Sequence, residues 1–430
     1  MAEPVNPMIE LGELRHGDEP EPPPAPRRPP TASARVALLC CAVLLSLAGS
    51  TPVPRQPAGV TLPTPRDAYF LVLADRLVVA AGGPGTAGAG ERFVKGYRLP
   101  DGAPVWRFDP PTGEDVLGVW AVAGLLLVAS SPAASYHDAR TVALDPRTGA
   151  ARWRQPGYPT PTQAGGLVLE TPAADGVGAI RAVDPATGTA RWSLALPGNR
   201  VVYGFGDRGV TAIMLFAGDG LVEVHDVDSG ALRRAGRLPT AVDRPQRLAL
   251  VLGDLLLLGD SSGTVTAYGL DRLDRRWTIP LPPQDWFLNC AEVICVSGRS
   301  AGLRVYDPAT GRPRWHNDQW RDAFSVDGRL VVAAGDWRAE ELAVLDPGTG
   351  RTLARLGRWR LADIDRTGVR TLGFRPATGN RTLVAELDVA AGQARTLTVL
   401  PGPWSDCTTT AAALVCTRPA GGLVLWPLNR

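Results

Sequence analysis

Short apolar runs separated by polar turn clusters occupy most of the chain. Residues 141–144 and 329–334 are two such runs, and Asp, Pro or Gly residues border both of them. Runs of this length that are rich in Val, Leu and aromatic residues, and that end in turn residues, are typical of β-strands. The pattern therefore predicts an all-β fold, with no helical stretch between its repeating parts.

A five-residue phrase, Asp-Pro-x-Thr-Gly, returns between pairs of apolar runs. It stands at residues 145–149, 184–188, 307–311 and 346–350, and Trp153, Trp192 and Trp315 follow the first three copies. Pro fixes φ at the first turn position, Asp can accept hydrogen bonds from backbone N–H groups further along, and Gly supplies the positive φ that closes a hairpin. A second hairpin signal precedes the phrase, as at Asp327-Gly328, so each unit is predicted to contain four strands.

Weaker copies of the phrase fill the gaps between the strong ones. They lie at residues 101–102, before Trp106; at residues 226–230; at Asp271, before Trp277; and at residues 388–392. The aligned glycines are 39 to 47 residues apart, except for one gap of 81 residues that holds two units because the Asp271 copy lacks its Gly. A repeat of roughly 40–50 residues with four strands is typical of a β-propeller blade.

The repeat resembles the PQQ-like β-propeller repeat, whose consensus is Ala-x-Asp-x-x-Thr-Gly-x-x-x-Trp. Residues 182–192 match that consensus in full, and the resemblance runs from about Asp67 to the C-terminus. It implies four-stranded antiparallel blades in which the repeated residues dock neighbouring blades. That structural set is Asp145, Gly149, Trp153, Asp184, Gly188, Trp192, Trp277, Asp307, Gly311 and Trp315. The same repeats build quinoprotein dehydrogenases and BamB-type assembly scaffolds, so the resemblance does not define a function.

Eight copies of the turn predict eight blades, the usual number for the family. A ninth, partial unit follows them, because residues 411–416 and 422–428 are strand-like but no phrase comes after. Residues 59–62 could pair there and close the ring, so nine blades is the alternative.

The N-terminal region does not follow the repeat. Residues 1–34 are charged and rich in Pro, which predicts a disordered tail, and residues 35–53 carry no charge after Arg35. Arg27, Arg28 and Arg35 lie just before the apolar run, so the positive-inside rule predicts a transmembrane signal-anchor with a cytoplasmic tail. The segments that follow are a linker at residues 54–64 and an extracytoplasmic propeller at residues 65–430. A cleaved signal peptide is the alternative.

Four cysteines lie outside the apolar segment, as two local pairs in similar contexts. The pairs are Cys290 with Cys295, and Cys407 with Cys416, and each has a Trp shortly upstream. An even count in local pairs outside the cytoplasm predicts two disulfides at the same hairpin position of two blades. Buried free thiols are the alternative.

The sequence contains no motif that predicts a nucleotide site, a metal site or a catalytic site. The Gly-x-Gly-x-x-Gly at residues 83–88 precedes a strand-like run rather than a helix, so a loop is the better interpretation. Residues 363–368 begin like a calcium loop that no later acid completes. The histidines His16, His137, His225 and His316 have no ligand spacing. We therefore assign no catalytic, cofactor or metal residues and expect no cofactor.

The net charge and the positions of the cysteines bear on two possible functions, nucleic-acid binding and quinoprotein catalysis. The net charge of +2 gives no reason to expect nucleic-acid binding, and Lys95 as the sole lysine is typical of a high-GC, actinobacterial genome. Quinoprotein dehydrogenases commonly hold their cofactor against a disulfide of adjacent cysteines, which the propeller lacks. We expect a monomeric, membrane-anchored, non-catalytic binding or scaffold module for an unidentified protein or envelope ligand. A PQQ-dependent or other envelope enzyme, and a sensor coupled through the tail, are the alternatives.

Overall fold

The computed structural model divides the chain into two compact units, residues 1–55 and residues 56–430. It describes residues 59–427 except for 67, 74, 84–90, 133–134, 172–176, 198–199, 207, 239–247, 261, 283, 291, 299–301, 336–339, 362–370, 405–406, 410–412 and 420. The expected tail and the expected membrane segment at residues 35–53 lie outside the described residues. In the part of the chain that the structure describes, no helix is both long enough and apolar enough to cross a membrane.

Seven consecutive units each contain four antiparallel strands, as the hairpin signals predict. Unit 1 is β2 (Tyr69–Leu73), β3 (Arg76–Ala81), β4 (Phe93–Arg98) and β5 (Pro104–Phe108). Unit 2 is β6 (Glu114–Val122), β7 (Leu125–Pro132), β8 (Arg140–Leu144) and β9 (Ala151–Pro156), with a 3-10 turn η1 (Tyr136–Asp138). Unit 3 is β10 (Tyr158–Pro161), β11 (Leu167–Thr171), β12 (Val177–Val183) and β13 (Ala190–Pro197). Unit 4 is β14 (Arg200–Gly206), β15 (Gly209–Phe216), β16 (Leu221–Asp226) and β17 (Leu232–Arg237).

The order continues through the second half of the chain. Unit 5 is β18 (Leu248–Leu252), β19 (Leu255–Gly259), β20 (Thr264–Gly269) and β21 (Arg275–Pro280). Unit 6 is β22 (Asp285–Cys290), β23 (Val293–Gly298), β24 (Gly302–Tyr306) and β25 (Pro313–Asn317). Unit 7 is β26 (Asp322–Val326), β27 (Arg329–Ala333), β28 (Glu340–Leu345) and β29 (Thr352–Leu361). Unit 8 is β30 (Leu372–Ala377), β31 (Arg381–Asp388) and β32 (Gln393–Pro401), and the end of β29 pairs with β30.

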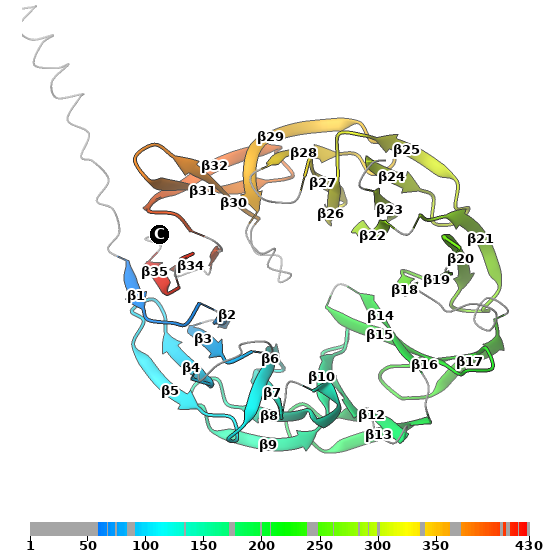
Figure 1. Ribbon diagram of the computed structural model, residues 1–430, viewed down its shortest axis with the longest axis horizontal. Helices are drawn as coiled ribbons and strands as arrows, with labels where there is room; N and C mark the ends of the chain where they lie inside the picture. The colour runs from blue at the N-terminus through cyan, green and yellow to red at the C-terminus, as the bar shows by residue number, and fades with distance from the viewer. Residues whose placement is uncertain are drawn as a thin grey trace, which may run out of the picture. The chain divides into compact units, whose positions relative to one another are not determined.

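A closing unit joins the two ends of the described chain. Strands β33 (Cys407–Thr409), β34 (Ala413–Thr417) and β35 (Leu423–Pro427) pair in order, and β1 (Val60–Leu62) adds to the edge of β35. Figure 1 shows β1 and β35 side by side where the series of units meets its own beginning. Residues 60–62, assigned to the linker on sequence, therefore belong to the propeller.

Among the described residues the strands form nine groups, of which units 4 and 5 share one eight-stranded sheet and units 7 and 8 share one seven-stranded sheet; the turn phrases predicted eight blades. The difference has a simple cause. The closing unit takes its outer strand from the N-terminal side of the chain, so no hairpin phrase precedes that strand. A count of phrases therefore misses this unit.

Apolar side chains are buried mainly between neighbouring units. The second strand of a unit is nearly inaccessible along its whole length, as in β3, β19 and β23. One core cluster joins Cys295 and Val305 of unit 6 to Leu330 and Leu345 of unit 7, and another joins the closing unit to unit 1. The fold is thus a series of sheets held at their seams, as expected for repeat architectures.

Candidate functional site

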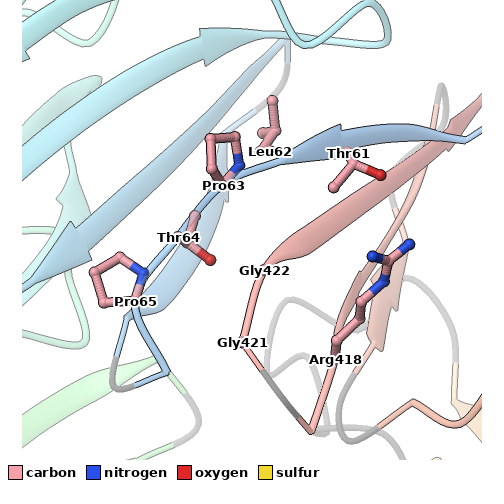
Figure 2. Close-up of a pocket in the computed structure, with 8 residues that line it drawn as sticks. All are labelled: Thr61, Leu62, Pro63, Thr64, Pro65, Arg418, Gly421 and Gly422. Atoms are coloured by element: carbon pink, nitrogen blue, oxygen red, sulfur yellow. The ribbon is translucent and has the colours of Figure 1, made fainter.

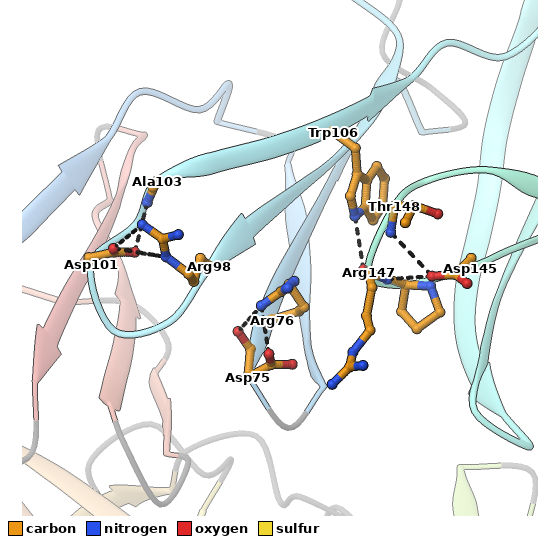
Figure 3. A network of polar contacts seen from close by, with 10 residues as sticks. Asp75, Arg76, Arg98, Asp101, Ala103, Trp106, Asp145, Arg147 and Thr148 are labelled. Carbon is orange, nitrogen blue, oxygen red and sulfur yellow. Dashed lines mark hydrogen bonds and ion pairs between the residues drawn. The ribbon is translucent and has the colours of Figure 1, made fainter.

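Each seam with a repeat tryptophan has the same hydrogen bond. The indole Nε1 of one unit donates to a backbone carbonyl in the turn of the next unit, at 2.8–2.9 Å. The pairs are Trp106 with Pro146, Trp153 with Pro185, Trp192 with Asp228, Trp277 with Pro308 and Trp315 with Pro347. Figure 3 shows the first of these pairs beside Asp145. The structure thus places Trp153, Trp192, Trp277 and Trp315 at seams, and adds Trp106 to the set.

The turn glycine faces that same indole. At Gly188, φ is +72°, and an added Cβ would lie 2.8 Å from ring carbons of Trp153. Gly149 and Gly311 repeat this arrangement against Trp106 and Trp277. Glycine is therefore needed twice at this position: for the left-handed backbone and for the close approach of the ring.

The turn aspartates close the hairpins from within. Asp145 accepts backbone N–H bonds from Arg147 and Thr148, and its second oxygen pairs with Arg152 at 2.5 Å. The hydrogen bond from Arg152 is the main cause that lowers the pKa of the Asp145 carboxyl. Asp184 accepts two backbone N–H bonds in the same way, from residues 186 and 187.

Asp307 completes the turn set. Its carboxylate accepts hydrogen bonds from the Thr310 backbone N–H and from the Arg314 guanidinium, and the hydrogen bond from Arg314 is the main cause that lowers the pKa of Asp307. The described members of the predicted structural set therefore make local turn and seam contacts.

Both predicted disulfides are present. Cys290 and Cys295 join β22 to β23, with an S–S distance of 2.05 Å, and Cys407 and Cys416 join β33 to β34. Each bridge links the first two strands of its unit, as expected from sequence, but the positions differ: Cys407 is directly paired with Cys416, whereas Cys290 is paired with Val293. All four cysteines are buried in core clusters.

The residues considered for metal or nucleotide binding are spread through the fold. His225 is buried against the Gly230 carbonyl and the Glu223 carboxylate, whereas His316 is exposed. His16, the side chain of His137, residues 84–90 and residues 363–368 lie outside what the structure describes. Among the described residues, no group of three or more His, Cys, Asp or Glu side chains could hold a metal ion.

An aromatic cluster that the sequence did not reveal lies on the first strands of units 2, 3 and 4 and on the 3-10 turn η1 of unit 2. We call it the aromatic wall: Trp120, Tyr136, Tyr158, Tyr203 and Phe205. The Tyr158 ring lies edge to face with Trp120 at 5.3 Å and with Tyr136 at 5.1 Å, and Tyr203 contacts Phe205 at 6.3 Å. Tyr136 is 52% exposed and Phe205 is 58% exposed. Figure 1 shows that β6, β10 and β14, which carry four of these residues, lie along the inner edge of the ring.

Backbone irregularities orient two members of the wall. The register of β6 shifts between Val116 and Gly118, and the Trp120 ring lies so close over Gly118 that an added Cβ would be 2.3 Å from it. The register of β14 shifts between Gly204 and Phe205, beside the most exposed ring. Bulges of this kind redirect side chains and are common next to functional sites.

A carboxylate connects the two halves of the wall. Glu170 stands opposite Tyr158 in the β10–β11 ladder and accepts a hydrogen bond from the Tyr203 hydroxyl. Burial, followed by the charge of Glu170, raises the pKa of Tyr203. Burial, followed by the nearby Tyr136 ring, raises the pKa of Tyr158. Both phenols are therefore neutral at pH 7 and can donate hydrogen bonds.

The wall escapes the repeat pattern for a structural reason. Trp120 lies late in its strand, whereas Tyr158 is the first residue of the equivalent strand in the next unit. When the repeats are aligned in sequence, Trp120 and Tyr158 therefore fall at different repeat positions. The signal available in the sequence was the presence of aromatic residues in first strands, away from the repeat tryptophan position.

A shallow pocket of about 430 Å³ lies where the ring closes (Figure 2). Residues 61–65 line one side, and Arg418, Gly421 and Gly422 line the other. The Arg418 guanidinium lies over the Trp404 ring, 5.4 Å from its centre. The pocket therefore offers one oriented cation and few other polar side chains.

Comparison with known proteins agrees with the repeat pattern. Residues 91–285 match the model of the family described as outer membrane protein assembly factor BamB. This match, the recurring turns and the four-stranded units support a PQQ-like β-propeller. No curated protein matches the chain significantly.

Several solved structures resemble the chain at low identity. BamB from Moraxella catarrhalis is 15% identical, with 86% of this chain and 99% of that chain covered and a TM-score of 0.43. Quinohemoprotein alcohol dehydrogenase from Comamonas testosteroni is 12% identical, with 87% and 76% covered and a TM-score of 0.43. The dihydro-heme d1 dehydrogenase NirN is 16% identical, with 94% and 87% covered and a TM-score of 0.43. Likenesses at this level carry no argument about function.

Proposed function

We propose that this protein is a non-catalytic binding or scaffold module, a propeller of nine blades whose aromatic wall holds a protein or envelope ligand. The observation that carries the proposal is the exposure of two rings of the wall, Tyr136 on the 3-10 turn η1 and Phe205 on β14, with register shifts in the strands β6 and β14 that carry Trp120 and Phe205. Exposed aromatic side chains on a rigid frame are typical binding residues, because they offer large contact area at low entropic cost.

We further propose that residues 35–53 anchor the protein in the cell membrane, with the propeller outside the cytoplasm and residues 1–34 inside. The arginines before the apolar segment support this orientation. The two disulfides support an oxidising compartment. A protease added to intact, wall-stripped cells should digest the propeller and spare the tail; a protected propeller would contradict the orientation.

The enzymatic alternative gains no support from the cysteines. Cys290–Cys295 and Cys407–Cys416 are separated pairs that join strands inside core clusters. They do not reproduce the adjacent pair that contacts the cofactor in quinoprotein dehydrogenases. The sensor alternative depends on residues 1–34, which lie outside the described residues.

Affinity capture of the full chain from native membranes tests the binding proposal. The wild type is compared with Tyr136→Ala, Phe205→Ala and the control Trp286→Ala, which removes an aromatic side chain that is 44% exposed in β22 of unit 6. Both the protein and the glycan content of each capture are measured. We expect one component to be enriched by the wild type and the control, and lost from both wall variants. Identical captures from all four proteins would refute the proposal.

A further inference from the structure

We propose that the ligand of the aromatic wall is a neutral saccharide chain. The inference rests on the proposed binding function and adds the chemical class of the ligand. A sugar ring has C–H faces that pack on aromatic rings and hydroxyl groups that require donors and acceptors at the rim. Sites for such ligands therefore combine aromatic surface with a few well-placed polar groups.

The row formed by Trp120, Tyr158 and Tyr136 supplies the apolar part. Neighbouring rings in this row are nearly perpendicular, at 83° and 79°, so the surface is stepped. Tyr136 stands at one end and is more than half exposed, and Trp120 and Tyr158 are partly exposed. Successive rings of a chain-like ligand can each contact one step of such a surface.

The polar part lies directly beside the row. Glu170 is opposite Tyr158, and one of its carboxylate oxygens accepts a hydrogen bond from the Tyr203 hydroxyl. The other oxygen can accept a hydrogen bond from a ligand. The hydroxyls of Tyr136 and Tyr158 make no hydrogen bond within the described part of the chain and can donate or accept. One carboxylate and two phenols match the alternating donors and acceptors of a sugar edge.

The charges near the wall favour a neutral ligand. The buried carboxylate of Glu114 is paired with Arg140, and Asp115 is paired with Arg92. The charged group in direct contact with the wall is the Glu170 carboxylate, which would repel an anionic ligand.

The backbone of β10 argues against a peptide strand as the ligand. Pro159 and Pro161 occupy two of its four positions, and proline has no backbone N–H. A peptide that adds to a sheet edge depends on those backbone hydrogen bonds. Recognition at β10 must therefore use side chains such as Tyr158, which suits a saccharide.

Titration of the purified full chain in detergent micelles tests the inference. The probes are neutral tetramers of N-acetylglucosamine, glucose and mannose, with a proline-rich decapeptide and a lysine-rich decapeptide as rivals. We expect one tetramer to bind and to perturb the fluorescence of the wild type. Trp120→Phe should reduce the fluorescence response, because the Trp120 indole lies at the site.

Three further variants and one control variant define the contacts. Tyr136→Ala and Glu170→Gln should each weaken tetramer binding about tenfold, or about 1.4 kcal/mol, whereas Trp286→Ala should stay within about twofold. Tyr158→Phe keeps the ring and removes only the hydroxyl, so it should weaken binding less than Tyr136→Ala. Equal melting temperatures show that each variant is folded.

Two results would overturn the inference. One is that no tetramer binds; the other is that a decapeptide binds in a manner that depends on Tyr136. If the capture from native membranes still depends on the wall in either case, the binding function stands and only the saccharide assignment falls.

Discussion

Replacement of a turn glycine by alanine measures how much a seam contributes to stability. Gly188 has φ +72°, and its alanine Cβ would press on Trp153 at 2.8 Å. Gly328, in the β26–β27 hairpin, has the same φ of +72°, but nothing lies within 4 Å of its added Cβ. The two substitutions therefore impose the same backbone strain, and only one of them disturbs a seam.

The expected costs follow from these geometries. Gly328→Ala should lower the free energy of unfolding by about 1–2 kcal/mol, the penalty for a left-handed non-glycine residue. Gly188→Ala should lower the free energy of unfolding by that amount and by about 1–3 kcal/mol more, because a methyl group is forced into a packed contact with Trp153. Urea unfolding followed by circular dichroism gives both values from the shift in midpoint.

A double-mutant cycle isolates the contact itself. With Trp153→Ala in place, the ring carbons at 2.8 Å are removed and only the Cβ of residue 153, at 3.1 Å, stays close to the added methyl group, so the cost of Gly188→Ala should fall toward that of Gly328→Ala. Equal losses in the free energy of unfolding for Gly188→Ala and Gly328→Ala in the wild-type background would show that the Trp153 indole does not pack against the turn. The docking role of the repeat tryptophan would then be wrong.

Three other outcomes test the seams, the disulfides and the turn carboxylates. Trp153→Ala should cost about 3–5 kcal/mol and Trp192→Ala less, because Trp153 is only 8% exposed and Trp192 is partly exposed; urea midpoints rank them. Replacing Cys290 and Cys295 together with Ala should cost about 2 kcal/mol or less without unfolding the ring, and non-reducing peptide mapping should find the pair oxidised in the wild type. The pKa of Asp307 is lowered in the fold, so its contribution is present above the unfolded value of about 3.9 and is lost as pH falls through the folded value. Asp307→Asn should therefore shrink the difference in urea midpoint between pH 7 and pH 3, and an unchanged difference would count against this assignment.

The seams could be predicted from the sequence because their chemistry is local and repeated. Asp184, Gly188 and Trp192 stand at fixed spacing, and each element has its own physical requirement: a carboxylate for the turn amides, a positive φ, and a ring for the next unit. Several copies at one period make chance agreement improbable. The disulfides followed from the same logic, since similar contexts place both pairs in the same hairpin.

The closing unit and the aromatic wall could not be predicted in the same way. Val60 pairs with Leu425 across almost the whole chain, and no local pattern encodes which strand edge a distant segment will join. The Trp120 ring meets Tyr158 only because two units pack side by side and a bulge redirects one strand. Contacts between different repeat positions depend on tertiary packing and leave no period in the sequence.

This contrast separates structural from functional aromatic residues in the chain. A residue that holds blades together recurs, because the same kind of seam forms between several pairs of units, and Trp106, Trp153 and Trp277 do so with nearly constant hydrogen bonds. A residue that binds a ligand has no reason to recur, because one ligand occupies one sector of the ring. Tyr136 and Phe205 are exposed, belong to no repeat position and lie on units 2 and 4, on either side of unit 3. In a repeat protein, departures from the repeat are therefore the first place to look for the binding site.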